Sequence, residues 1–533
     1  MSTRAIRAEV GESQRRRSIG LILLSGAVAA VAIFPVTWIF VRALEVDPVR
    51  AMEIVLRPRS LEVVLNSVLL MASVTLLSIL IGVPLAFLTV RTDIPFRRFW
   101  TVVCALPLAI PSYLGAFAFI AAFGPRGELQ SLLAPLGIER LPEIYGFTGA
   151  IIVITLYTYP YVYLTTRAAL KSFDRTLIDA ARTLNHSYWT AFRRVTVSHI
   201  RPAVAAGALL VALYAVSDFG TPAFMQLDVF TRQIYVEYRG WNLDYAALFS
   251  VQLIVVTVAI LALESRIRGT ETIHRRSGSR QGLVISLGRW RWIAMLFPAL
   301  VTTFALALPI AIFATWLITG SAAGSTNLAF EWQFAMNSVY VALIAAAIAA
   351  AAALPVAYYS AVVGSPLSWV FERATYVGYA VPGIVIGLAL VYFGANYAFF
   401  FYQTIPLLVF AYVVRFMPQS VGTSRSAILG LNPSLGEAAR SLGRSPIETF
   451  RAITLPLIAP GIVAGAALVF LTTMKELPAT LLLRPTGFET LVTHIWRVEE
   501  AAAYSQAAVP AFALLLVSGL SMLIILHQEG DHV

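Results

Sequence analysis

The sequence predicts an all-α integral membrane protein with about twelve transmembrane helices, arranged as two parallel repeats of six. Three observations support this fold class. The 533 residues are 59% hydrophobic and only 13% charged, whereas soluble domains carry about 25% charged residues. Apolar runs long enough to cross a bilayer, which takes about 20 residues, recur along the chain. The second half also repeats the first at fixed spacings.

Each expected span is an apolar run bounded by polar or charged segments. The twelve runs cover residues 18–43, 62–90, 99–123, 145–166, 201–220, 244–264, 292–318, 334–362, 370–394, 398–421, 458–481 and 505–527. Three pairs of prolines recur inside equivalent spans, namely Pro84 and Pro355, Pro111 and Pro382, and Pro160 and Pro418. Membrane helices tolerate such prolines where neighbouring helices satisfy the freed backbone groups.

The repeat divides the chain into a first half, 1–264, a linker, 265–291, and a second half, 292–533. Six spans per half is an even number, so both halves have the same orientation and are related by an axis along the membrane normal. Most of the 39 Lys and Arg residues fall on one side, the side of the N-terminus and the linker. Basic loops stay in the cytoplasm, so we expect both termini and the linker to be cytoplasmic.

A polar helical hairpin lies between the tenth and eleventh spans. Ser434 and Glu437 have the spacing of a capping box, and Ser445 and Glu448 repeat it after a break. Gly443 stands where a helix ends in a left-handed residue. The same stretch occurs 258 residues upstream, with Asp179, Ala180 and Ala181 in place of Glu437, Ala438 and Ala439, and Asn185 in place of Gly443.

Glu437-Ala438-Ala439, Gly443 and Leu455-Pro456 resemble the EAA loop of binding-protein-dependent ABC importer permeases. In that family the loop is a coupling helix that docks into the ATP-hydrolysing subunit. The resemblance implies the type I importer fold, a bacterial inner-membrane location, an ATPase homodimer, a periplasmic substrate-binding protein and alternating access. The coupling residues that it implies are Asp179, Ala180, Ala181, Asn185, Glu437, Ala438, Ala439 and Gly443. The alternative is a cytosolic hairpin without a docking role, which two equivalent copies make less favoured.

Several kinds of chemistry are absent from the sequence. No G-x-x-x-x-G-K-[ST] motif is present, so any ATP must be bound by a separate subunit. No paired catalytic carboxylates, metal-binding motif or nucleophile elbow indicates an enzyme, a metal site or a cofactor. Cys104 is the only cysteine. The net charge of +11 follows the loops between spans and sets topology, so we do not expect nucleic-acid binding.

Two acids fall late in equivalent spans. Asp218 and Glu476 are 258 residues apart, and Lys475 precedes the second. A charge in a membrane span is costly and usually faces a pathway or a partner. We therefore expect Asp218 and Glu476 either to line the translocation pathway or to pair with Lys475 or Arg415, and an interfacial position near lipid headgroups is the third possibility.

A second resemblance concerns cargo. The segments 217–222 and 475–491 look like those of ferric-iron importer permeases that fuse two halves in one chain. The resemblance implies ferric iron as cargo, with thiamine, phosphonate or polyamine as alternatives. A secondary transporter with parallel six-helix repeats is the alternative from another class. Four tyrosines in span four could supply oxygen ligands to iron, but we expect them to form an interfacial belt: Tyr157, Tyr159, Tyr161 and Tyr163.

Overall fold

The computed structural model describes residues 3–124, 127–137, 142–173, 183, 190, 192–268, 284–319 and 329–530. Within these residues the regular structure is helical, apart from one isolated bridge between Thr92 and Ile285. Nine described helices are long and apolar enough to cross a membrane, or up to eleven if each of two bent pairs counts as one span. A shorter apolar helix, Tyr504–Gly519, lies where we expected the twelfth.

The chain forms two compact units. Unit 1 contains Met1–Val46 and Glu331–Thr493, and unit 2 contains Asp47–Phe330 and His494–Val533. Helix α1 (Thr3–Leu44), the first expected span, therefore packs with helices of the second half in unit 1. Helix α15 (Leu308–Thr319), from the second half, packs on helix α5 of the first half in unit 2. The compact units thus differ from the sequence halves in two ways: the first spans of the halves are exchanged, and the end of the second half, His494–Val533, lies in unit 2.

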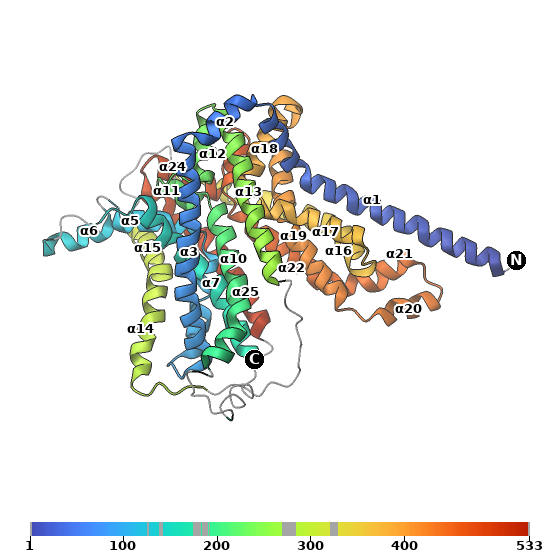
Figure 1. Cartoon of the computed structure of the whole chain (residues 1–533), viewed down its shortest axis with the longest axis horizontal. Helices are drawn as coiled ribbons and strands as arrows, with labels where there is room; N and C mark the ends of the chain where they lie inside the picture. Colours follow the sequence, from blue (N-terminus) through green and yellow to red (C-terminus); the bar gives the residue numbers. More distant parts are fainter. Residues whose placement is uncertain are drawn as a thin grey trace. The chain divides into compact units, whose positions relative to one another are not determined.

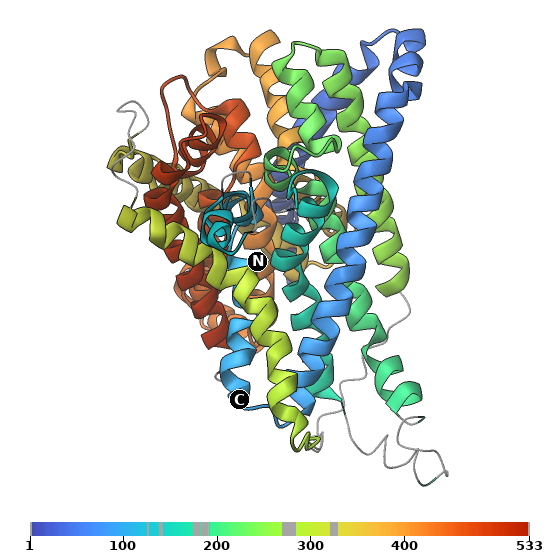
Figure 2. The same ribbon diagram turned by 90° about the vertical axis from the view of Figure 1, so that its left-hand side faces the viewer.

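Unit 2 is built around three helices, α3, α7 and α10, that pack along one another (Figures 1 and 2). The other described helices of this unit surround them. The bounds of its main elements are α2 (Pro48–Leu56), α3 (Pro58–Arg91), α4 (Arg97–Val103), α5 (Ser112–Phe123), α6 (Glu128–Leu133), α7 (Gly146–Ser172), α10 (Val197–Ser217), α11 (Gly220–Phe224), α12 (Phe230–Arg239), α13 (Leu243–Arg268), α14 (Trp290–Thr302) and α25 (Ala508–Gly530).

Unit 1 repeats this arrangement with α16, α19 and α22. Its elements after α1 are α16 (Trp332–Val362), α17 (Pro366–Ala380), α18 (Gly383–Asn396), α19 (Ile405–Leu429), α20 (Pro433–Ser441), α21 (Pro446–Thr449), α22 (Leu455–Met474), α23 (Pro478–Leu483) and the start of α24 (Leu491–Glu500). Short π-helical turns, Phe192–Thr196 and Phe450–Thr454, precede α10 and α22.

The recurring prolines have two different structural roles. Those of spans two, eight, four and ten stay inside continuous helices. Pro111 and Pro382 instead stand immediately before new helices, α5 and α18. The helices on either side of these prolines bend by 95° and 98°. Spans three and nine, expected as single helices, are therefore broken where proline removes a backbone donor.

Small residues allow close helix packing in both repeats. A side chain at Gly207 of α10 would overlap Thr165 of α7, and one at Gly465 of α22 would overlap Thr423 of α19. These residues match at the 258-residue spacing. Glycine at such crossings lets two membrane helices approach closely, so each pair of neighbouring helices is fixed by the same contact in both halves.

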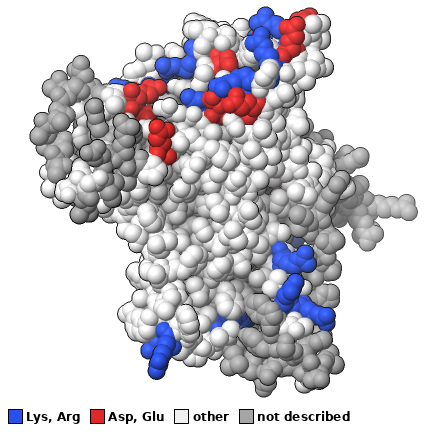
Figure 3. All heavy atoms as spheres, turned by 60° about the vertical axis from the view of Figure 1, so that its left-hand side comes forward, with Lys and Arg blue, Asp and Glu red and all other residues white. Residues whose placement is uncertain are grey.

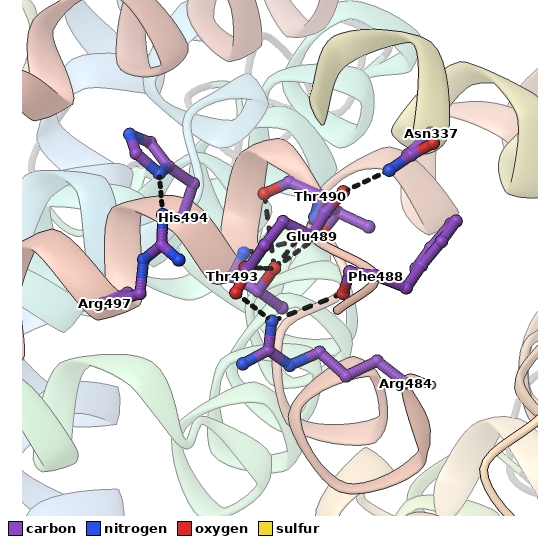
Figure 4. Close-up of polar contacts among 8 residues, drawn as sticks. All are labelled: Asn337, Arg484, Phe488, Glu489, Thr490, Thr493, His494 and Arg497. Atoms are coloured by element: carbon purple, nitrogen blue, oxygen red, sulfur yellow. Dashed lines mark hydrogen bonds and ion pairs between the residues drawn. The ribbon is translucent and has the colours of Figure 1, made fainter. Parts of the chain in front are cut away.

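A second matched feature ties the loop after span five to span two. In the first half, Asn66 donates to the Asp228 carbonyl at 3.1 Å, and Ser67 accepts from the Phe230 amide at 3.0 Å. In the second half, Asn337 donates to the Glu489 carbonyl at 2.8 Å (Figure 4).

Ser338 completes the second clasp by accepting from the Leu491 amide at 2.8 Å. The turn that this clasp holds is closed by an ion pair between Arg484 and Glu489, and the other Glu489 oxygen accepts from the Thr493 hydroxyl at 2.7 Å (Figure 4). Asn66-Ser67 and Asn337-Ser338, which are 271 residues apart in the sequence, therefore hold irregular backbone at equivalent places.

The end of the linker is bound to the loop after α3. The Ile285 amide donates to the Arg91 carbonyl at 2.7 Å, and the Asp93 amide donates back to Ile285 at 3.2 Å. The Asp93 carboxylate accepts from the Leu287 amide at 2.7 Å and from the Ser286 hydroxyl at 3.1 Å. The Leu287 hydrogen bond holds the pKa of Asp93 below its usual value. These bonds fix the chain just before α14.

The interfacial belt expected in span four is wrong for three of its four tyrosines. Tyr157, Tyr159 and Tyr163 are at most 2% exposed. The Tyr159 hydroxyl donates to the Cys104 carbonyl at 2.9 Å, and the Tyr163 hydroxyl donates to the Thr101 carbonyl at 3.2 Å. These phenols bind the carbonyls that the irregular backbone before α5 leaves available.

Candidate functional site

The first candidate site is the polar hairpin formed by α20 and α21 in unit 1 (Figure 1). The expected capping role of Ser434 is wrong. Asn432 is the N-cap and accepts from the Ser434 amide at 3.1 Å, and Pro433 takes the first helical position. An Asn-Pro start satisfies the cap earlier, because proline at that position needs no partner for its missing N–H. Glu437 therefore lies beyond the first turn, exposed to solvent.

The break of this hairpin is as the sequence predicts. Gly443 has φ 85°, and the Arg444 amide donates to the Ala439 carbonyl at 3.2 Å. This is the bond of a Schellman ending. The second capping box also forms, since the Ser445 amide donates to Glu448 at 2.7 Å and the Glu448 amide donates to the Ser445 hydroxyl at 3.3 Å.

The hairpin has the surface of a docking element. Ala439 is buried, while Glu437 and Ala438 are exposed. Three large apolar side chains on the hairpin are also exposed: Leu435, Leu442 and Ile447. The coupling residues expected in the first copy, Asp179, Ala180, Ala181 and Asn185, lie outside the described residues.

The second candidate site surrounds Asp218, in unit 2. Helix α10 ends at Ser217 and α11 begins at Gly220, so the carboxylate lies at a helix break. The Ser112 hydroxyl, at the start of α5, lies 3.0 Å from each carboxylate oxygen of Asp218. The Tyr214 hydroxyl in turn donates to Ser112 at 3.1 Å. The acid thus joins the end of span five to the break in span three.

The equivalent acid in unit 1, Glu476, has a different partner. Arg415 Nη1 lies 2.7 Å from Glu476 Oε1, and the Ala479 amide at the start of α23 lies 3.3 Å from the same oxygen. A side chain at Gly383, the first residue of α18, would overlap both Arg415 and Glu476. The ion pair therefore lies directly on the broken end of span nine.

Equivalent positions at the two helix breaks carry different residues in the two halves. Gly383 lies 271 residues after Ser112, and Arg415 lies 258 residues after Tyr157. Where the first half has a small hydroxyl and a phenol, the second has no side chain and a guanidinium. Removing the side chain at position 383 makes the room that the guanidinium fills. Each half therefore satisfies its acid at the same break by different chemistry.

Lys475 does not take part in the pair that the sequence suggested. Among the described residues it has no ion-pair partner, and Glu476 pairs with Arg415 instead. Of the two partners that we expected for Glu476, Arg415 is confirmed as the contact. Whether either acid lines a pathway stays a prediction.

Sequence reasoning missed Ser112, Tyr214 and Gly383. A signal was available, because the proline pair Pro111 and Pro382 aligns Ser112 with Gly383 directly. The replacement of Ser112 by Gly383 beside the break indicates that the two halves make different contacts there. The fold is needed to show that these contacts are with Asp218 and Glu476.

Comparison with known proteins agrees with this architecture. Residues 78–268 and 353–529 each match the family described as the inner membrane component of binding-protein-dependent transport systems. The chain belongs to this family. The two matches confirm two fused copies in one chain, as the repeat predicts, and family members are transport components of the inner membrane.

The relatives differ in how much of this chain they match. The chain is 32% identical over 517 residues to the Fe(3+)-transport system permease protein FbpB 2 of Haemophilus influenzae, covering 96% of this chain and 98% of the relative. It is 23% identical to the ferric transport system permease protein FbpB of Actinobacillus pleuropneumoniae, covering 85% of this chain and 69% of the relative. The sulfate transport system permease protein CysW of Synechocystis is 25% identical over 42% of this chain and 81% of its own length.

Proposed function

We propose that this chain is the membrane-spanning permease of an ATP-driven importer of ferric iron. The assignment of ferric iron as cargo rests on how much of this chain each relative matches. The Fe(3+)-transport permease matches nearly the whole of both chains, whereas relatives named for molybdenum and sulfate match 27% to 42% of this chain. The iron-transport relative thus shares the fused arrangement of two halves, which supports iron over the alternatives.

The cargo is tested by growth. Deleting the gene should impair growth when iron is limiting and spare growth when thiamine, phosphonate or polyamine is limiting, and the wild-type gene on a plasmid should restore it. A defect limited to thiamine, phosphonate or polyamine starvation would overturn the iron assignment and leave the permease assignment intact.

The proposed partners are a homodimeric ATPase in the cytoplasm and a periplasmic binding protein. ATP is bound by the ATPase, and this chain supplies two coupling hairpins. The exposed Glu437 and the apolar side chains Leu435 and Leu442 support docking of α20, because solvent-facing leucines on a short polar helix gain from burial against a partner. Two equivalent hairpins suit a two-fold symmetric partner.

The proposed orientation places both termini and the linker in the cytoplasm. On the face drawn in Figure 3, acidic side chains gather near one end together with Lys and Arg side chains, and the charged side chains coloured near the opposite end are Lys and Arg. In unit 2, α3 carries the Arg59–Glu62 ion pair near its start and ends at Arg91. Short loops rich in Lys and Arg are typical of the cytoplasmic side.

A secondary transporter remains the rival from another class. It needs no ATPase, so purified chain in vesicles with an iron gradient alone would take up iron. We expect no uptake unless the ATPase, ATP and the loaded binding protein are all present.

A further inference from the structure

The two acids differ in charge balance. Glu476 is paired with Arg415 at 2.7 Å and is 6% exposed. Asp218 has no ion-pair partner among the described residues and is bound only by hydroxyl and backbone groups. It also keeps partial exposure. A carboxylate without a cation in a low-dielectric region is costly. Of the two equivalent acids, only Asp218 in the first half therefore has a negative charge that no cation among the described residues balances.

Among the described residues, the side chains that bond to the Asp218 carboxylate carry hydroxyl groups. Ser112 and Tyr214 form a hydrogen-bonded chain to the carboxylate. One turn further along α5, the Tyr157 ring covers Gly115, and its hydroxyl is buried with no hydrogen-bond partner in the described part of the chain. A buried hydroxyl without a partner is costly, so this hydroxyl would gain from contact with a further polar species.

We propose that Asp218, Ser112 and Tyr214 form a transient contact site for the transported cation, present in the first half and absent from the second. This inference rests on the proposed function, because it assigns the site to a hard cation that takes oxygen ligands. In the second half the guanidinium of Arg415 occupies the equivalent place and repels a cation. Glu476 is then a positioning residue that fixes the broken span nine.

The composition of the site suits transport rather than storage. One carboxylate with neutral hydroxyls holds a cation weakly, since affinity rises with the number of charged ligands. Conduction needs a site that is favourable to enter and weak enough to leave. A site with one carboxylate can therefore take up the cation released by the binding protein and pass it on toward the cytoplasm.

The first test measures iron uptake into vesicles that contain the full chain, its ATPase and iron-loaded binding protein. Asp218→Asn keeps the volume and one acceptor oxygen for the Ser112 hydroxyl but removes the charge, and should lower uptake about tenfold or more. The triple variant Ser112→Gly, Tyr157→Arg, Asp218→Glu installs the residues of the second half. It should accumulate normally, because that set packs at the equivalent break, and should lose uptake. Wild-type rates in Asp218→Asn would overturn the proposal.

The second test needs no turnover. Tb³⁺ is titrated into the purified full chain, and tyrosine-sensitised luminescence reports binding close to a tyrosine, which the variants below assign. Asp218→Asn and Tyr214→Phe should weaken the saturable signal, whereas Tyr340→Phe, an exposed tyrosine of α16, should leave it unchanged. Coincident titrations of the wild type and Asp218→Asn would overturn the site. Absence of iron uptake by the wild type would overturn the cargo instead, and this titration would still decide whether Asp218 holds a cation.

Discussion

Gly383 shows how a single missing side chain determines the chemistry of one half. A Cβ at this position would overlap Arg415 and Glu476, so Gly383→Ala should separate the ion pair. Breaking a buried pair costs about 3 kcal/mol or more, and the purified variant should therefore have a lower apparent melting temperature. Gly519→Ala, in α25 where nothing lies within 4 Å, is the control. An unchanged melting temperature in Gly383→Ala would show that the pair does not depend on this contact.

At the residue scale, the sequence located both acids but not their partners. The 258-residue spacing of the repeat places Asp218 and Glu476 at equivalent positions, and this spacing can be read directly from the sequence. The hydrogen bond from Ser112 to Asp218 joins residues 106 apart in sequence, and it depends on the packing of α5 against α11. The capping residue of α20 was misassigned for a local reason, since Asn432 and Ser434 both have favourable cap chemistry and Pro433 decides between them.

At the scale of the element, Glu437 of the hairpin can be changed to test docking without affecting the stability of its helix. The helix dipole acts within the first turn, and Glu437 lies beyond it, exposed. Glu437→Arg should therefore leave membrane accumulation unchanged while lowering transport and substrate-stimulated ATP hydrolysis by about tenfold or more, as expected when one charged contact is reversed at an interface. Asp179→Arg should act in the same direction. Normal transport in the Glu437 variant would remove the coupling assignment.

The second capping box of the same hairpin gives a pH dependence. The hydrogen bond from the Ser445 amide lowers the pKa of Glu448 below its usual value. The box therefore stabilises the hairpin above the unfolded pKa, about 4.3 for Glu, and this contribution is lost as pH falls through the lowered folded value. Glu448→Gln should speed hydrogen exchange of the Ser445 amide relative to the wild type at pH 7. The difference should shrink below about pH 4, and a difference that persists there would contradict the role of the carboxylate.

Element boundaries were predictable wherever apolar length decided them. Spans two and eight correspond to α3 and α16, each with its proline inside the helix. Spans three and nine were not predicted as broken, because Pro111 and Pro382 lie within long apolar runs, as Pro84 and Pro355 do. Whether a proline bends or breaks a membrane helix depends on which neighbours satisfy the freed carbonyls, and Tyr159 and Tyr163 do so beside the first break.

At the scale of the whole molecule, the topology is open to a direct test. Cys104, the only cysteine, is fully buried, so cysteines introduced elsewhere can be labelled without a background signal. A membrane-impermeant maleimide added to intact cells should label Phe400→Cys, in the exposed loop between α18 and α19, and should not label Ser279→Cys in the linker. The reverse pattern would invert the proposed orientation.

The repeat predicted two halves, but it could not predict that α1 packs with the second-half helices. The sequence of an apolar span does not specify which helices it will contact.

The unequal residue sets at the two helix breaks have a consequence for assembly. A permease made from two copies of one polypeptide would have either a phenol or a guanidinium on both sides. Separate polypeptides could assemble in mixed or mismatched pairs. A single reading frame that encodes both halves delivers one of each to every transporter, at a fixed one-to-one ratio. Tyr157 and Arg415 can therefore diverge independently, so substitutions in either half affect only one side of each assembled transporter.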